Sequence, residues 1–225
     1  MHSKIEIVNL FDLSHTLAAE LFEGKQYPWE VLKEIKDFIL KLGARLDPAM
    51  FDHPEEDIWI ARDAKIAPTA NLNGPLIVDS GAEIRHCAFV RGSAIVGKNA
   101  VVGNSTELKN CILFDGVQVP HFNYVGDSVL GYKAHMGAGS ITSNVKSDKQ
   151  NIVIHIGRGM ETGLRKIGAM LGDRVEVGCN RVLNPGTIIG RDCIVYPTSC
   201  VRGVIPENHI YKGAAAIVAR RQEMK

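Results

Sequence analysis

VDSGAEIRHCAFVRGSAIVGKNAVV, residues 78–102, has an apolar residue at every sixth position. In a parallel β-helix each six-residue step forms one side of a triangular coil, and the first residue of the step points into the bore. The period therefore predicts an all-β fold, a parallel β-helix of hexapeptide repeats. Its apolar positions are Ile60, Ile66, Leu72, Val78, Ile84, Val90, Val96, Val102, Leu108 and Phe114, and later Leu171, Val177, Leu183, Ile189, Val195 and Val201.

The repeat is not continuous. The frame loses one residue twice, around Pro120–His121 and around Asp127–Val129. Residues 145–170 leave the period altogether, and we expect them to form a loop outside the prism. The repeat predicts about five coils before this excursion and about two after it. A long loop inside a strict solenoid is usually functional or interfacial.

Residues 1–57 lack the repeat and are expected to form a helical extension. Ser14–Phe22 has the pattern of a short helix. Pro28 suits the first position of a second helix and Gly43 suits its end. Because a solenoid exposes unpaired strands at its ends, the extension is expected to cover an end or to pack along a side.

The β-helix itself is assigned to residues 58–205. Residues 206–225 are expected to form a C-terminal tail made of a strand and a short helix.

Composition excludes several classes of protein. Lys and Arg number 26 and Asp and Glu 25, so no basic field indicates nucleic acid binding. No apolar run is long enough to span a membrane, and Lys4 and Glu6 interrupt any signal-peptide core, so we expect a cytoplasmic protein with no membrane partner. Five cysteines without a CxxC pair indicate reduced structural thiols.

The stretch VPHFNYVGDSVLGYKAHMGAGSITSN, residues 119–144, departs most from the repeat and concentrates polar side chains. Arg91 and Lys109 lie eighteen residues apart, so they stack one coil above the other at about 4.8 Å. Two stacked cations repel unless an anion bridges them. Two interpretations stay open, a phosphate site or a pair of solvated cations, and His121 alone is equally compatible with a structural corner residue.

HFNYVGDSVLG and GAGSITSN, within Arg91–Asn144, resemble the acetyltransferase half of the bifunctional N-acetylglucosamine-1-phosphate uridyltransferase/glucosamine-1-phosphate N-acetyltransferase family, archaeal-type members included. The likeness continues more loosely through TGLRKIGAMLGDRVEVG and NPGTIIG. It implies a left-handed β-helix, a homotrimer with sites between chains, and acetyl-CoA as co-substrate. The implied reaction is acetylation of the amine of an amino-sugar phosphate such as glucosamine-1-phosphate, a step of UDP-N-acetylglucosamine biosynthesis.

The resemblance also implies a role for individual residues. His135 stands where the bacterial enzyme has a substrate-binding asparagine, and the coenzyme A arginine near the C-terminus is replaced within KGAAA, which leaves Lys212, Arg220 and Arg221 as candidates. The implied roles are general base for His121, a place near the reacting acetyl group for Asn144, substrate binding for Arg91, Lys109, Tyr124, His135 and Lys149, and cofactor binding for Ala138, through its backbone, and Lys212.

These residue types suit direct acetyl transfer. A sugar amine must lose a proton before it attacks a thioester, and a histidine with a pKa near ~6.5 matches that task. The oxyanion of the tetrahedral intermediate needs donors, for which the backbone N–H groups of Gly137–Gly139 are candidates together with Asn144. No nucleophilic residue is required.

Three alternatives remain. A γ-class carbonic anhydrase would bind zinc through His86 and His121, but its third ligand falls on Gly126, so no metal is expected. A non-catalytic hexapeptide protein would only bind a sugar phosphate or nucleotide. An acyltransferase could use a nucleotide-linked sugar or another acyl donor.

Uridylyl transfer is not expected, because residues 1–57 are too short to hold a uridyltransferase domain.

Overall fold

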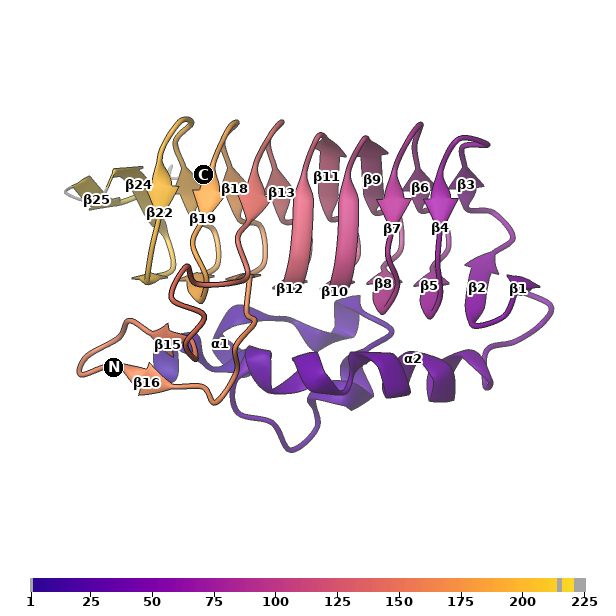
Figure 1. Ribbon diagram of the computed structural model, residues 1–225, viewed down its shortest axis with the longest axis horizontal. Helices are drawn as coiled ribbons and strands as arrows, with labels where there is room; N and C mark the ends of the chain where they lie inside the picture. Colours follow the sequence, from indigo (N-terminus) through magenta and orange to yellow (C-terminus); the bar gives the residue numbers. More distant parts are fainter. Residues whose placement is uncertain (1, 214–215, 221–225) are drawn as a thin grey trace, which may run out of the picture.

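A parallel β-helix dominates the computed structural model, which describes residues 2–213 and 216–220 (Figure 1). Strands one coil apart pair in parallel register, and the fold is the predicted left-handed type. Three faces build the prism. The first face contains β2 (Ile58–Ala61), β5 (Leu76–Val78), β8 (Ala94–Val96), the ends of β10 (Glu107–Leu113) and β12 (Tyr124–Leu130), β17 (Ala169–Leu171), β20 (Thr187–Ile189) and β23 (Val204–Ile205).

The other two faces carry the remaining long stacks. The second face contains β3 (Lys65–Ile66), β6 (Glu83–Ile84), β9 (Val101–Asn104), β11 (Gln118–His121), β13 (His135–Met136), β18 (Glu176–Val177), β21 (Ile194–Val195) and β24 (His209–Gly213). The third face contains β4 (Asn71–Leu72), β7 (Phe89–Val90), the beginnings of β10 and β12, β14 (Ile141–Thr142), β19 (Val182–Leu183) and β22 (Cys200–Val201).

Antiparallel strands close the two ends of the solenoid. β1 (Phe51–Glu55) pairs with β2, and β25 (Ala216–Ala219) pairs with β24. The tail therefore contains a second strand where a short helix was expected, and residues 214–215 and 221–225 lie outside the described part of the chain. Within the excursion, β15 (Val153–Ile154) and β16 (Met160–Glu161) form a small hairpin.

Residues 2–46 form a helical layer along the side of the prism (Figure 1). It consists of η1 (His2–Ile5), α1 (Ile7–Leu10), η2 (Leu13–His15), η3 (Ala19–Phe22), η4 (Pro28–Lys33) and α2 (Ile35–Gly43). The expected Ser14–Phe22 helix is two short 3₁₀ segments. Pro28 begins a 3₁₀ turn, and the α-helix starts only at Ile35.

This layer covers the first face. α2 contacts β5, β8 and β10, and η4 contacts β12. The outward residues Ile77, Ile95 and Ile112 lie in register on consecutive coils and are fully buried, as are Ile35 and Ile39 of α2. The open question about the extension is thereby answered: it packs along a side.

The structure corrects one position of the repeat. Leu113, not Phe114, pairs with Val96 and Leu130, so the first one-residue loss falls between Leu108 and Leu113 rather than around Pro120–His121. Phe114 lies outside the bore, with its ring 5.2 Å from that of Phe11 in the helical layer. The second loss, around Asp127–Val129, is confirmed, because Leu130 pairs with Leu113 seventeen residues earlier.

The coils shorten again near the C-terminus. Ile189 pairs with Ile205 and Val195 with Tyr211, sixteen residues apart in both cases. The six-residue period is lost there, and for that reason the sequence predicts fewer coils than the roughly nine turns observed. None of the described helices is long and apolar enough to span a membrane.

Candidate functional site

The corner between the third and first faces is shortened in two consecutive coils. The chain turns there through one left-handed residue, Asn110 in β10 (φ 50°) and Asp127 in β12 (φ 47°), whereas the preceding coil uses Gly92 and Ser93. The loss of one residue lets β10 and β12 run through the corner without a break. Side chains from neighbouring coils consequently converge on this corner.

Asp127 is the centre of the resulting cluster. Asp127 is 3% exposed, and its carboxylate accepts hydrogen bonds from three side chains. Lys109 Nζ lies 3.0 Å from both carboxylate oxygens, Asn110 Nδ2 lies 2.8 Å from one, and Asn144 Nδ2 donates to the other. The corner is thus held by a buried, charge-assisted network.

Tyr124 and Asn144 border this network. The Asn144 amide donates to the Tyr124 hydroxyl at 3.2 Å. A Cβ at Gly126 would lie 2.4 Å from that hydroxyl oxygen, so the ring lies over β12 only because residue 126 is a glycine. Burial raises the pKa of Tyr124, so its phenol remains neutral and available as a donor at physiological pH.

The stacked cations have carboxylate partners within the chain. Arg91 donates to Glu107 at 2.8 Å, and this bond raises the pKa of Arg91. Lys109 pairs with Asp127. Glu107 and Asp127 therefore supply the negative charges that stabilise the two stacked cations. The sequence analysis did not identify these two residues. Asp127 follows Lys109 by eighteen residues, the same separation that linked Arg91 to Lys109.

His121 lies at a different corner, between the second and third faces. It ends β11, and Phe122 after it is left-handed (φ 51°) and 60% exposed. The buried Asn123 accepts from the His121 backbone N–H and donates to the carbonyls of Gly137 and Ser140, which fixes the turn. In the described part of the chain the imidazole makes no hydrogen bond or ion pair.

The backbone next to this imidazole has one free donor. Ala138 lies one coil beyond His121, because the Gly139 N–H donates to the His121 carbonyl at 3.0 Å. Gly137 donates to Val177 at 2.7 Å. Of the three N–H groups expected to stabilise an oxyanion, only that of Ala138 has no acceptor among the described residues.

The remaining predicted residues lie elsewhere. His135 is on the second face, with Nδ1 2.8 Å from a Glu176 oxygen. Lys149 lies in the excursion, beside a hollow of about 590 Å³ that Lys146 and Arg165 also line. Lys212 Nζ lies 5.6 Å from the centre of the Tyr196 ring near the C-terminal end.

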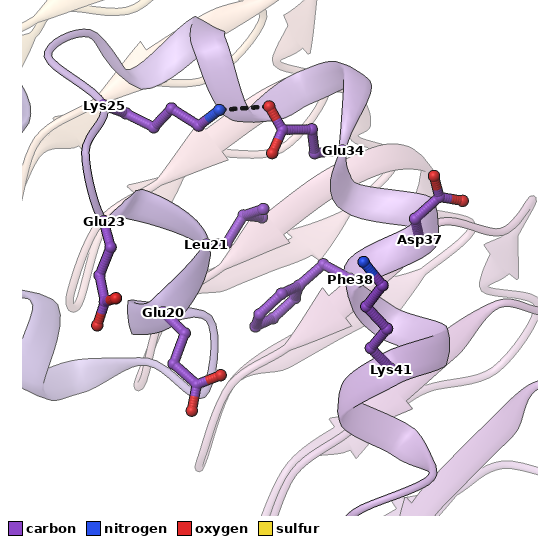
Figure 2. A pocket seen from close by; sticks show the side chains of 8 residues that line it. All are labelled: Glu20, Leu21, Glu23, Lys25, Glu34, Asp37, Phe38 and Lys41. Carbon is purple, nitrogen blue, oxygen red and sulfur yellow. Dashed lines mark hydrogen bonds and ion pairs between the residues drawn. The ribbon is translucent and has the colours of Figure 1, made fainter.

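A separate hollow lies on the helical layer (Figure 2). Lys25 and Glu34 form an ion pair at its edge, and Phe38 lies in its floor. Four carboxylates and two lysines line it, and none of the predicted site residues is among them.

The structure contains neither a disulfide nor a metal cluster among the residues it describes. Burial raises the pKa of Cys111 to about 12 and that of Cys193 to about 11, so both thiols remain protonated. Cys87, Cys179 and Cys200 are exposed and free.

Comparison with known proteins finds one matching family model and a set of curated relatives. The family model described as "GMPPB C-terminal domain" matches residues 72–213. The bifunctional protein GlmU of Methanococcus maripaludis is 29% identical over 215 residues, which cover 87% of this chain and 48% of that protein. The bifunctional sugar-1-phosphate nucleotidylyltransferase/acetyltransferase of Sulfurisphaera tokodaii is 30% identical over 166 residues, 65% of this chain and 41% of that protein. The chain thus spans about half the length of the curated relatives it matches.

Solved structures show only a distant likeness. The acetyltransferase domain of PglB from Neisseria gonorrhoeae matches 80% of this chain and 62% of its own, with 15% identity and a TM-score of 0.34. A mutant of AntD, an N-acyltransferase from Bacillus cereus, matches 77% of this chain and 91% of its own, with 15% identity and a TM-score of 0.39.

Proposed function

We propose that this chain, which belongs to the family of the GMPPB C-terminal domain, is an acetyl-CoA-dependent acyltransferase. The proposed acceptor is the amine of an amino-sugar phosphate such as glucosamine-1-phosphate. GlmU and the nucleotidylyltransferase/acetyltransferase among its relatives support this chemistry. The activity would contribute to UDP-N-acetylglucosamine biosynthesis in the cytoplasm, where acetyl-CoA is available.

One observation carries the proposal: an unpaired imidazole lies one coil from an unpaired backbone donor. His121 has no side-chain partner in the described chain, and the adjacent Ala138 N–H has no acceptor there. Attack of an amine on a thioester requires a general base and a hydrogen-bond donor for the oxyanion.

The proposed reaction is a direct transfer. His121 takes a proton from the ammonium of the sugar, and the amine attacks the thioester carbonyl carbon. The oxyanion that forms accepts a hydrogen bond from the Ala138 N–H. The nitrogen of the tetrahedral intermediate then gives up its second proton to solvent, and the intermediate collapses. The carbon–sulfur bond breaks, and the coenzyme A thiolate leaves and takes up the proton from His121.

The acceptor-binding residues belong to the other corner. In the same chain, Arg91, Lys109 and Asn144 lie at or after the ends of third-face strands and Asn144 bonds to the Tyr124 hydroxyl, whereas His121 comes before the third face. We therefore propose a homotrimer in which this corner of one chain meets the His121 corner of its neighbour around a three-fold axis.

The test is acetyl-CoA turnover with glucosamine-1-phosphate, compared between the wild type and His121→Ala. Loss of a general base lowers kcat/KM by roughly 10²–10⁴-fold, with an unchanged thermal unfolding curve. His53→Ala, at a histidine of β1 whose ring stacks on Trp59, serves as the surface control. Wild-type turnover by His121→Ala rejects the assignment.

The excursion favours a second candidate acceptor, a nucleotide-linked amino sugar. The charges of Arg91 and Lys109 are already balanced within the chain. Of the cations around the hollow of about 590 Å³, Lys146 pairs with Asp148, whereas Lys149 and Arg165 form no ion pair in the described chain. That volume is large enough for a ligand bigger than a sugar phosphate. UDP-linked amino sugars in the same turnover assay distinguish the two acceptors.

A further inference from the structure

Arg181 is the largest fully buried side chain among the described residues, and it lies where the other coils place a short residue. It directly precedes β19, as Ser140 precedes β14 and Ser199 precedes β22, and these three strands pair in register. These positions point into the bore at the corner between the second and third faces. The guanidinium therefore lies inside the prism.

Equivalent residues on earlier coils are satisfied by carbonyl groups. Thr106 Oγ1 donates to the Val119 carbonyl at 3.0 Å, and Asn123 Nδ2 to the Gly137 carbonyl at 2.8 Å. Ser140 Oγ donates to the Gly178 carbonyl at 2.8 Å. All three guanidinium nitrogens of Arg181, by contrast, are buried without a hydrogen-bond partner in the described chain, and so is the Oγ of Ser199 one coil further on.

Nothing else in the described structure balances the charge of Arg181. The centre of the Tyr211 ring lies 5.9 Å from the guanidinium carbon, and no carboxylate of the described chain forms an ion pair with Arg181. The Tyr211 hydroxyl donates to the Cys200 carbonyl at 2.9 Å. Arginine stays protonated in proteins, and a buried cation without a counter-charge is strongly unfavourable. Burial accordingly lowers the pKa of Arg181.

The unsatisfied atoms also define the chemistry of the missing partner. The guanidinium offers only donors, and the Ser199 hydroxyl adds one more. A water molecule would accept from these groups but would leave the charge unbalanced. An acceptor with a negative charge answers both requirements, and complete burial limits it to a small ion.

We propose that Arg181 and Ser199 bind a small monovalent anion, chloride being the abundant example, inside the C-terminal end of the bore. β22 is the last strand of the third face among the described residues, so the next coil is incomplete on that side. The ion enters from this end, beneath β24 and the antiparallel β25. Its role is to hold the last coils closed around Arg181.

The test measures thermal unfolding of the whole protein in sodium chloride, sodium bromide and sodium gluconate at equal ionic strength. Above the dissociation constant, each tenfold rise in halide raises the wild-type Tm by roughly 3–5 °C, because the ion binds only the folded state. Gluconate is too large for the bore and gives no such rise. Arg181→Met abolishes the halide effect.

Arg174→Met is the matched control, because Arg174 is a surface arginine paired with Asp192 and its loss leaves the halide effect intact. Crystals grown in bromide provide a measurement that does not depend on the variant folding. They show an anomalous peak beside the Arg181 guanidinium. Water density at that place, or an equal halide response in wild type and Arg181→Met, overturns the proposal.

Discussion

Asp127 shows how one residue organises the cluster between the third and first faces. Its left-handed backbone (φ 47°) turns the corner in one residue, and its side chain accepts from Lys109, Asn110 and Asn144. The turn and the network therefore depend on the same residue. Asp and Asn are the non-glycine residues that adopt this conformation most readily, which explains why both shortened corners use one of them.

We predict that Asp127→Ala destabilises the protein by roughly 2–4 kcal/mol, because Lys109 and two amides lose a buried acceptor. Lys109 retains partial access to water, which keeps the loss below that of a fully buried pair. Urea unfolding measures the change. Glu107→Gln, at the more exposed pair with Arg91, is the control and should cost less than about 1 kcal/mol. Equal losses in both variants would contradict the role of the network.

Asp79 is a buried carboxylate with one oxygen satisfied. Oδ1 accepts from the Ser80 N–H at 2.7 Å, and Oδ2 has no partner in the described chain. Burial raises the pKa of Asp79 above the ordinary value of 3.8, so the folded protein binds this proton more tightly than the unfolded one. Stability from this group is complete below about pH 3.8 and is lost as the pH rises through the raised pKa.

Asp79→Asn is therefore expected to be more stable than wild type at pH 7, by roughly 1–3 kcal/mol, because the amide has no charge to bury. The difference should disappear near pH 3.5, where the wild-type carboxyl is protonated. Chemical unfolding at both pH values tests this. A lower stability of the variant at pH 7 would show that the charged form is compensated.

At the scale of elements, the helical layer has the largest consequence for the solenoid. The triplets Leu76–Val78, Ala94–Val96 and Ala169–Leu171 are apolar at every position, and all are fully buried. Strands buried on both sides lose the alternation of apolar and polar residues. The sequence thus contained a signal that one face of the prism is covered, and the six-residue period alone did not detect it.

Because the helical layer covers the first face, outward-facing residues of that face should matter more for stability than those of the second face. Ile112→Ala on the covered first face should cost about 2–5 kcal/mol, since it leaves a cavity beneath α2. Val101→Ala on the uncovered second face is the matched control and should cost less than about 1 kcal/mol. Thermal unfolding compares the two. Similar losses would mean that the helical layer contributes little to stability.

The position of the layer along the prism was not predictable in the same way. The helical spacing of Ile35 and Ile39 marks a buried face but does not say what it packs on. The contact between Phe11 and Phe114 joins distant parts of the chain, and it exists because the coil shortens at Asn110. One residue lost at a corner moves Phe114 from the bore to the outside, a change that a fixed period cannot express.

At the scale of the molecule, the predicted site residues divide between two corners. Stacking predicted correctly that residues one coil apart lie together, as Arg91 and Lys109 do. It did not show that their charges are balanced within the chain. Glu107 reaches Arg91, and Asp127 reaches Lys109, only because of the side-chain directions and the shortened corner. His121 lies before the third face and makes no hydrogen bond to Tyr124 or Asn144 in the described chain, and in the proposed trimer a neighbouring chain completes the site.

The division predicts that two inactive variants restore activity to each other. His121→Ala and Asn144→Ala should each be inactive alone. Trimers reassembled from an equal mixture should regain about a quarter of wild-type turnover. The reason is that one interface in four joins an intact His121 corner to an intact Asn144 corner. Sedimentation verifies the trimer and turnover of acetyl-CoA measures the recovery. Mixing the two proteins without dissociation is the control and should give no recovery. A fully inactive reassembled mixture would place the whole site within one chain, and a monomer in sedimentation would exclude the shared site directly.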